Sequence, residues 1–292
     1  MSSNIMQELL DLLDLETLEV NLFRGKSTNI VGTKNVFGGQ VLGQSLMAAG
    51  RTVEGRLAHS MHGYFLRAGD TRAPIVYEVD RVRDGKSFTT RNVKAIQHGE
   101  VIFTCSASFA VHEDGLEHQS PMPQVEGPDG VLNETELRQK IAHLLPEKIR
   151  ASFERERPIE IRPINPVNPF APQRQEPLRH QWLKAQSRLP DDPFLHQCLL
   201  AFASDFSLMG TAMLPHGVSF AQANMQAASI DHAMWFHREF RMDEWLLYEM
   251  DSTSASGSRG MNRGSIFTQD GRLVASVAQE GLMRLREVAE KY

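Results

Sequence analysis

Residues 37–49, with the sequence FGGQVLGQSLMAA, carry the strongest fold signal in the chain. Two glycines open this stretch, and the apolar residues that follow recur at the spacing of one helix face. This pattern predicts a loop that enters a buried helix. Upstream of it, residues 5–18 predict a short amphipathic helix and residues 19–24 predict a strand.

A series of strand-like segments follows the buried helix. Turn residues such as Asp84-Gly85 and His98-Gly99 separate the segments, as they do in β-hairpins. The predicted strands are residues 60–67, 75–83, 87–97 and 101–111. One helix followed by an antiparallel meander predicts an α+β layout.

The second half of the chain has the same order of elements. A proline-containing linker and a charged helical stretch at 133–155 come first. A second apolar helix is then predicted at 195–213, followed by strands at 227–238, 245–252, 259–269 and 273–286. We therefore predict two domains, residues 1–117 and 157–292, joined by residues 118–156, a linker with a helix.

Short segments of the two halves also match each other. Residues 76–79 (VYEV) match 247–250 (LYEM), Ser87 matches Ser258, and 98–101 (HGEV) match 270–273 (DGRL). The offset stays close to 170 residues, as expected for a duplicated unit. A single sheet of this kind leaves an apolar face and an edge that a second copy can cover.

The composition is that of an ordinary globular protein, with 41% hydrophobic residues, 23% charged residues and a formal net charge of −5. No basic face stands out, so we expect no nucleic-acid partner. The two cysteines lie far apart, which argues against a disulfide framework and favours a reducing, cytoplasmic location. Residues 1–13 lack the basic start of a signal peptide. The longest apolar runs fall far short of the ~18–20 residues that span a bilayer, so we expect no membrane insertion.

Familiar catalytic signatures are absent from the sequence. It contains no G-x-S-x-G nucleophile elbow, no Walker loop, no G-x-G-x-x-G after a strand and no H-E-x-x-H zinc motif. The eleven histidines show no metal-ligand spacing. An enzyme with this sequence therefore needs neither an activated serine nor a metal, and we expect no cofactor.

Asp205 is the first candidate, because it is a polar residue on an apolar helix. In the helix predicted at 195–213, Phe202, Phe206 and Met209 belong to one apolar stripe, and Asp205 falls along its edge. A carboxylate in such a place is desolvated unless it is paired. The alternative is that Asp205 caps a shorter helix that starts later.

Two further candidates lie on predicted strands. Gln279 is the polar member of an otherwise apolar row on the last strand, although a glutamine that faces solvent or an edge backbone group explains it as well. Ser229 opens the strand that starts at 227, where alternation puts it on the same face as Asp231 and Trp235. A serine in a turn at the start of a strand is the alternative for Ser229.

Three basic side chains, those of His59, Arg259 and Arg263, are candidates for substrate contacts. His59 and His62 flank Met61 at the start of a strand, so one of them points inward and the other outward. Arg259 and Arg263 lie beside glycines, where the phosphates of a ligand can approach. A structural histidine and a solvated strand edge are the respective alternatives.

Several of these segments resemble the bacterial acyl-CoA thioesterase II family, and the resemblance covers nearly the whole chain. The matching segments are Phe37–Gln40, Ser229–His232, Met234–His237, Tyr248–Ser254, Val274–Ser276 and Gln279–Gly281. The Asp-His-x-Met-Trp-Phe-His run and the Gln-Glu-Gly run are specific to that family. The resemblance implies an α+β architecture of two fused hotdog folds, each an antiparallel sheet wrapped around a central helix.

The resemblance also implies a catalytic trio of an aspartate, a hydroxyl residue and a glutamine, which match Asp205, Ser229 and Gln279. The family often has threonine at the hydroxyl position, and serine lacks the methyl group that fixes the threonine rotamer. In the first half the comparable positions are about Gln40 for the aspartate and Ala107 for the glutamine. We therefore predict one active site per chain, with the first half supplying walls.

The expected reaction is hydrolysis of acyl-CoA to a fatty acid and CoA, by a water that the trio holds and without a covalent intermediate. Besides acyl-CoA, we expect further copies of the chain as partners, because hotdog sheets commonly pair into homodimers or homotetramers. Two alternatives stay open on the same scaffold. One is an enoyl-CoA hydratase that uses Asp231 with His232, or His62, and the other is a non-catalytic acyl-CoA-binding protein.

Overall fold

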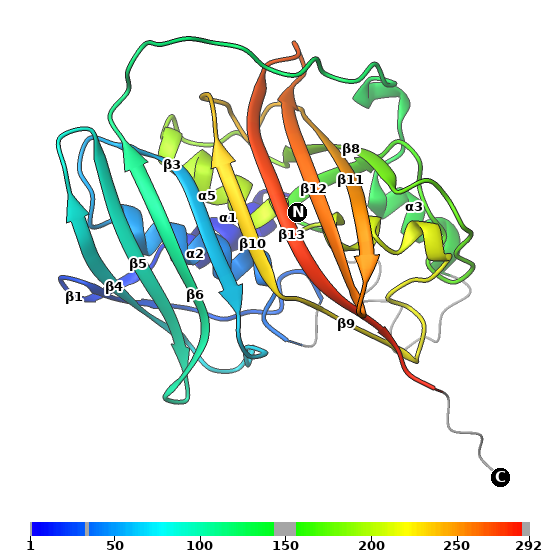
Figure 1. Cartoon of the computed structure of the whole chain (residues 1–292), viewed down its shortest axis with the longest axis horizontal. Coiled ribbons are helices and arrows are strands. Elements are labelled where there is room, and N and C mark those ends of the chain that lie inside the picture. The colour runs from blue at the N-terminus through cyan, green and yellow to red at the C-terminus, as the bar shows by residue number, and fades with distance from the viewer. Residues whose placement is uncertain (1, 33–34, 143–155, 288–292) are drawn as a thin grey trace.

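The computed structural model describes residues 2–32, 35–142 and 156–287. Their strands form one large antiparallel sheet (Figure 1). The elements of the first half are α1 (Ser2–Leu13), β1 (Glu16–Glu19), β2 (Leu22–Gly25), α2 (Gly38–Gly50), β3 (Leu57–Phe65), β4 (Ile75–Asp84), β5 (Phe88–Gln97) and β6 (Glu100–Ala110). A linker with η1 (Pro128–Gly130) and α3 (Glu134–Ile141) leads to the second half.

The second half repeats the order from β1 to β6, with two additional short helices and one additional strand, β9. Its elements are β7 (Ile159–Pro163), β8 (Leu178–Ala185), α5 (Pro193–Ser204), α6 (Leu208–Thr211), η3 (Leu214–His216), β9 (Met225–Ser229), β10 (Asp231–Phe236), β11 (Leu246–Ser256), β12 (Arg259–Thr268) and β13 (Leu273–Leu285). Each of the four strands predicted in the first-half meander starts and ends within about three residues of an observed strand.

The order of the strands in the sheet mirrors itself about the centre. From one edge to the other it is β1-β2-β4-β5-β6-β3-β10-β13-β12-β11-β8-β7, with β9 paired to β13. At the centre β3 and β10 pair antiparallel, with Met61 opposite Met234. Each half therefore covers an edge that the other half would leave unpaired. The predicted α+β architecture of two fused hotdog folds is confirmed.

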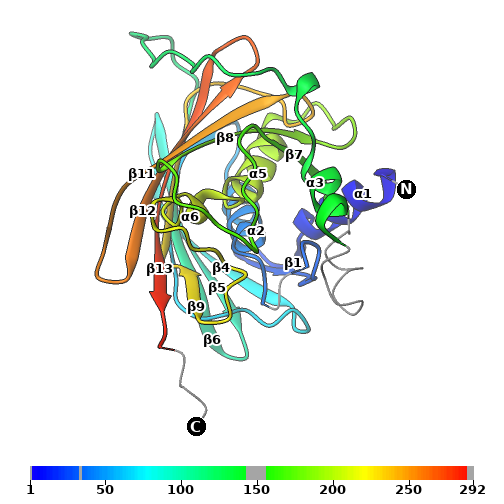
Figure 2. The ribbon, with the colours of Figure 1, turned by 90° about the vertical axis from the view of Figure 1, so that its right-hand side faces the viewer.

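The helices cover one face of the sheet (Figure 2). At the centre of this layer α2 and α5 pack antiparallel, because Gly39 near the start of α2 contacts Phe202 near the end of α5, and Gly50 at the end of α2 contacts Phe194. A Cβ atom on Gly39 would lie 2.1 Å from the carbonyl oxygen of Phe202. Only glycine allows the two helices to approach so closely at this point.

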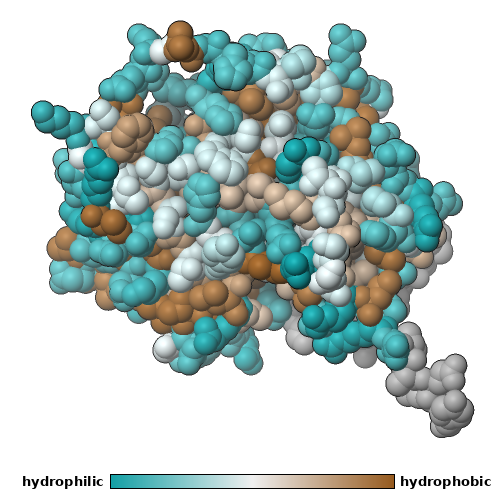
Figure 3. Space-filling view, in the orientation of Figure 1, coloured by the Kyte–Doolittle hydropathy of each residue, from teal (hydrophilic) through white to brown (hydrophobic). Residues whose placement is uncertain are grey.

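The other face of the sheet points away from the helices and carries a mixture of hydrophilic and hydrophobic side chains (Figure 3). Along β5 the side chains alternate between the buried face and this outer face. A strand with one buried face produces a clear two-residue period. This is why the sequence predicted β5, at 87–97, to within one residue.

Two long elements predicted from the sequence are each broken in the structure. The predicted helix 195–213 ends at Ser204, and Ser207, with a φ of 67°, separates α5 from α6. The predicted strand 227–238 is interrupted at Ile230, which bonds to Glu280 and Phe65 on two different strands and separates β9 from β10. The break reverses the alternation, so the expectation that Ser229 shares a face with Asp231 was wrong.

Smaller differences occur nearer the N-terminus and in the linker. The single strand predicted at 19–24 is a hairpin of β1 and β2. In the predicted helical stretch 133–155, α3 begins with a capping box in which Asn133 and Glu136 satisfy each other's backbone N–H groups. Residues 143–155 of that prediction lie outside the described residues.

The chain from Pro193 to His216 is long and apolar enough to span a membrane, by length and composition alone. The expectation that no apolar run reaches that length was therefore wrong. This segment contains α5, and 78% of its most apolar window is buried inside the protein. Packing in the core accounts for its apolar character.

Candidate active site

Asp205 follows the last residue of α5 and forms its C-terminal cap. It does not cap a later helix. The residue before it is fixed by the sheet: Ser204 Oγ lies 2.9 Å from His232 Nε2, and the Tyr248 hydroxyl donates to the Ser204 carbonyl oxygen at 2.9 Å. These three side chains are buried. Strands β10 and β11 therefore hold the end of α5, and with it the Asp205 carboxylate.

Three hydrogen-bond donors converge on the Asp205 carboxylate. Gln279 Nε2 on β13 donates to Oδ1 at 3.0 Å, and Ser229 Oγ at the end of β9 donates to the same oxygen at 3.5 Å. The backbone N–H of Gly39, in the first turn of α2, donates to Oδ2 at 3.0 Å. The trio named from the resemblance thus lies together, and the first half contributes a donor as well as a wall.

The side-chain oxygen of Gln279 is a buried hydrogen-bond acceptor. Its side chain is fully buried, and its Oε1 atom has no hydrogen-bond partner among the described residues. Asn262, opposite it on β12, donates to the Gln279 carbonyl oxygen at 3.4 Å and accepts the N–H of Ala212 at 2.9 Å. The backbone at Gln279 is therefore fixed, while its Oε1 atom is left for a further donor, which a buried acceptor needs.

Burial dominates the electrostatics of the site. It raises the pKa of the Asp205 carboxyl above its ordinary value, although the hydrogen bonds from Gln279, Gly39 and Ser229 lower that pKa in part. Burial also lowers the pKa of His232 to about 3, so this imidazole is neutral near pH 7. Within the described part of the chain, no group of three or more His, Cys, Asp or Glu residues could hold a metal ion.

The two glycines at the start of α2 bring backbone atoms against the carboxylate. A Cβ atom on Gly38 would lie 2.7 Å from Asp205 Oδ2 and 3.1 Å from the Phe65 ring. A helix N-terminus carries free N–H groups and a partial positive charge. The Gly39 contact was not predicted, and its only trace in the sequence is the pair of glycines that opens the helix.

The first-half counterpart of Asp205 is not Gln40. Gln40 lies in the first turn of α2, and its Nε2 atom donates to the Lys26 carbonyl oxygen at 3.0 Å. Because Asp205 follows the end of α5, its counterpart follows the end of α2, at Arg51 or Thr52. The prediction went wrong because it compared the start of one helix with the end of the other.

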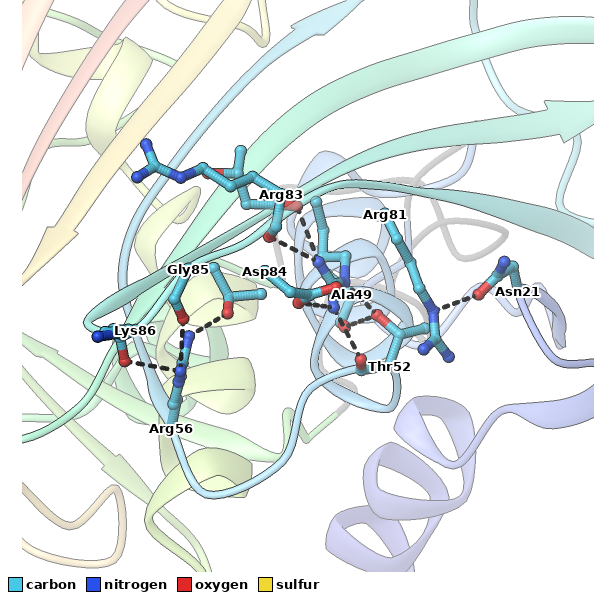
Figure 4. A network of polar contacts seen from close by, with 12 residues as sticks. Asn21, Ala49, Thr52, Arg56, Arg81, Arg83, Asp84, Gly85 and Lys86 are labelled. Atoms are coloured by element: carbon cyan, nitrogen blue, oxygen red, sulfur yellow. Dashed lines mark hydrogen bonds and ion pairs between the residues drawn. The ribbon is translucent and has the colours of Figure 1, made fainter.

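A polar network that includes Thr52 and Asp84 occupies this region of the first half (Figure 4). The buried Arg91 side chain belongs to it: it donates to Thr52 Oγ1 at 2.8 Å and to Asp84 Oδ1 at 2.6 Å, and Arg91 is 1% exposed. Ala107 lies opposite Arg91 in the sheet, in the position that Gln279 has in the second half. The first half therefore has an arginine and an alanine where the second half has its polar cluster.

The structure does not bring the three basic candidates to this cluster. Each is bonded elsewhere: His59 to Ser108, Arg259 to Glu280 and Arg263 to Asp251. Gln279 and Glu280 are neighbours on β13 and point to opposite faces of the sheet. Arg259 therefore lies on the face away from Asp205. The solvated strand edge that the sequence left open as the alternative fits Arg259 and Arg263, whose side chains are about half exposed.

A pocket of about 720 Å³ is lined by residues of α3 and α6, together with residues from other segments of both halves. We call it the α3–α6 pocket, and its lining includes Glu134, Arg138, Arg157, Arg179, Ser207 and Gly210. Ser207 is only two residues from Asp205. The volume is in the range of small-molecule sites. Nothing in the sequence singled out its arginines, which lie on three successive segments: α3, the residues before β7, and β8.

Comparisons with known proteins agree on one family. A model described as "Acyl-CoA thioesterase" matches residues 148–282, and one described as "Acyl-CoA thioesterase N-terminal domain" matches residues 28–110. "Acyl-CoA thioesterase 2" of Haemophilus influenzae is 43% identical over 286 residues, which cover 98% of this chain and 100% of that protein. Human "Acyl-coenzyme A thioesterase 8" is 42% identical, over 94% of this chain and 88% of that protein.

Solved structures give the same result for the fold. The acyl-CoA thioesterase II TesB2 from Mycobacterium marinum superposes with a TM-score of 0.78 at 43% identity, covering 96% of this chain and 99% of that one. A hot dog fold protein of unknown function from Alicyclobacillus acidocaldarius reaches 0.77 at 19% identity, with 96% and 99% covered. The second comparison bears on the fold alone.

Proposed function

The chain belongs to the acyl-CoA thioesterase family, and from that premise we propose that Asp205, Ser229 and Gln279 hold the water that hydrolyses the thioester. The observation that carries this proposal is the convergence of Gln279 Nε2 and Ser229 Oγ on Asp205 Oδ1, beside a Gln279 Oε1 atom that lacks a partner. When a water enters, the Ser229 hydroxyl turns from its 3.5 Å contact with Asp205 and donates to that water, which in turn donates to Asp205 and to Gln279 Oε1. All three residues then act on a single reactant.

In the proposed mechanism the held water attacks the thioester carbonyl carbon. Asp205 accepts a proton as the carbon–oxygen bond forms, and the carbon–sulfur bond then breaks. The CoA thiolate leaves and takes up a proton, so that the products are a free acid and CoA. No residue becomes acylated. The partial positive charge at the start of α2 favours the oxyanion that develops on the carbonyl.

The function is tested by following thiol release over time with a series of acyl-CoA substrates of increasing chain length. Crotonyl-CoA serves as the discriminating substrate. Loss of its enoyl absorbance without release of thiol would mean hydration instead of hydrolysis. Saturable binding of acyl-CoA without any thiol release would mean a binding protein. The neutral, buried His232 offers little support for a hydratase that uses it as an acid.

The pH dependence of the reaction is expected to follow the raised pKa of Asp205. Because the base must be ionised, kcat/KM should fall as the pH drops through a pKa above ~3.9, the value of a free aspartate. Ionisation of a carboxyl with a raised pKa costs stability as the pH rises, so protonation of Asp205 does not itself unfold the protein. A kcat/KM profile over the acid range, with melting temperatures at each pH, checks this. An acid limb centred below the free-aspartate value would contradict it.

Ser229→Ala is expected to lower kcat by about 10-fold, since it removes one of the hydrogen bonds that hold the attacking water. The melting temperature should change little, because Ser229 lies at the end of β9 and its hydroxyl has one protein partner at 3.5 Å. Ser229→Thr keeps the hydroxyl and is the matched control, with a rate near that of the parent. A large drop in melting temperature with Ser229→Ala would instead assign the hydroxyl to folding.

A further inference from the structure

Four cationic side chains line the α3–α6 pocket and two carboxylates, Glu134 and Glu156, face them; the cationic residues are Arg138, Lys140, Arg157 and Arg179. Glu134 Oε2 accepts from Arg138 at 2.5 Å and from Arg157 at 2.8 Å. Both of these arginines and Glu134 are largely buried. Because two guanidinium groups already share the Glu134 carboxylate, Glu134 does not neutralise a third cation in the pocket.

Arg179 is that third cation. It lies on β8 opposite Met250, on the face of the sheet that carries the helices, and its guanidinium lies near Gly210 of α6. Its Nε atom is buried without a hydrogen-bond partner, and no described residue forms an ion pair with it. The pKa of Arg179 is lowered by burial, while the charge of Glu134 acts in the opposite direction.

Other donors in the pocket are also left without acceptors. Arg157 Nε and Gln181 Nε2 are buried and have no partner among the described residues. Three unpartnered donors around one cavity are costly in the empty protein, because each has lost its water without gaining a hydrogen bond. A ligand rich in acceptor oxygens would satisfy several of them at once.

The pocket is also connected to the proposed catalytic centre. Ser207 lines it two residues after Asp205. The Arg157 guanidinium lies over the ring of Phe206, 5.3 Å from its centroid, and Phe206 is the residue next to Asp205. A thioester that reacts at Asp205 can therefore extend into this pocket on one side of its reactive carbonyl.

We propose that the α3–α6 pocket binds an anionic oxygen group carried by the thioester substrate, and that Arg179 is the residue that selects for it. This inference rests on the proposed function, because it takes Asp205 as the place where the thioester reacts. A guanidinium group pairs with phosphate or carboxylate through two parallel N–H donors, which fits both chemistries. The group is therefore either a phosphate of CoA or a carboxylate at the far end of the acyl chain.

The test compares Arg179→Met with the parent on three substrates of equal chain length. These are octanoyl-CoA, octanoyl-pantetheine, which has no phosphate, and the CoA monothioester of octanedioic acid, which has a terminal carboxylate. Loss of a charge-assisted pair should lower kcat/KM by about 10–100-fold, mainly through KM. A loss with both CoA esters but not with octanoyl-pantetheine identifies the phosphate. A loss confined to the octanedioic ester identifies the acyl carboxylate.

Equal loss on all three substrates, or no loss on any, would overturn the proposal. Arg179→Lys keeps the charge but not the paired donors, so it should show a smaller loss with the same substrate dependence, and it serves if Arg179→Met fails to fold. Arg72→Met, which removes an exposed arginine in the first half, is the control and should match the parent. If Asp205→Asn keeps the parental rate, the catalytic trio is wrong, yet the substrate dependence at Arg179 still reports on the pocket.

Discussion

Asp205→Asn is expected to lower kcat for acyl-CoA hydrolysis by about 10²–10⁴-fold, the usual contribution of a positioned general base. The substitution keeps the shape of the side chain and removes its charge. Without the carboxylate, the attacking water loses both its proton acceptor and the group that orients its lone pair. KM should change less than kcat, because the substrate itself is not held by Asp205.

The hydrogen bonds around Asp205 make the expected loss of kcat larger than the removal of the charge alone would. Both carboxylate oxygens accept from donors, Oδ2 from Gly39 and Oδ1 from Gln279 and Ser229. An asparagine can offer one oxygen, so its NH₂ group must face a donor on one side. The amide is therefore poorly held, and the water would be misplaced as well as less activated.

Thiol release by the purified variant, with melting temperature measured in parallel, checks this expectation. Asp270→Asn is the matched control, because Asp270 is an exposed carboxylate in the turn between β12 and β13 of the same half. It should hydrolyse acyl-CoA at the parental rate. If Asp205→Asn also does so while remaining folded, Asp205 is not the base.

The local pattern of the sequence predicted the strands well and the breaks poorly. Strands β4 and β5 were predicted nearly to the residue, because a half-buried strand leaves a two-residue period between turn residues. The interruption of the helix at Ser207 depends on a positive φ, which the neighbouring apolar residues Phe206 and Leu208 conceal. The helical spacing continues across the break, so periodicity alone predicts one helix.

The candidate site was only partly accessible from the sequence for a different reason. Asp205, Ser229 and Gln279 were identified because the chain resembles a family, and each taken alone had an ordinary structural explanation. The donor from Gly39 lies 166 positions from Asp205 in the chain. Only the antiparallel packing of α2 on α5 brings the two together, and no local pattern encodes that packing. Arg179 was not identified from the sequence either, because what distinguishes it is a buried Nε atom without a hydrogen-bond partner, which no local pattern reveals.

Gly39→Ala is expected to cause the largest loss of stability among simple substitutions in the helix layer. A Cβ atom at this position would lie 2.1 Å from the Phe202 carbonyl oxygen and 2.4 Å from the Phe37 ring. Alanine favours a helix by about 1 kcal/mol over glycine, but overpacking a fixed backbone costs about 1–3 kcal/mol or more. Because the atom met first is backbone, we expect the upper end of that range and a net loss of about 2 kcal/mol.

The expected result is a melting temperature lower by about 4–8 °C, measured by thermal unfolding. Activity should fall as well, because separating α2 from α5 withdraws the Gly39 N–H from Asp205. Gly43→Ala, whose Cβ would lie 3.0 Å from the Cys198 carbonyl oxygen, should cost less, and Gly127→Ala, with open space around it, should be nearly neutral. If the three variants melt alike, the approach of the two helices does not depend on glycine. If instead the melting temperature falls most for Gly39→Ala, less for Gly43→Ala and least for Gly127→Ala, close packing of α2 on α5 depends on Gly39. Because the Gly39 N–H also donates to Asp205, this one residue then links the stability of the helix pair to the proposed chemistry.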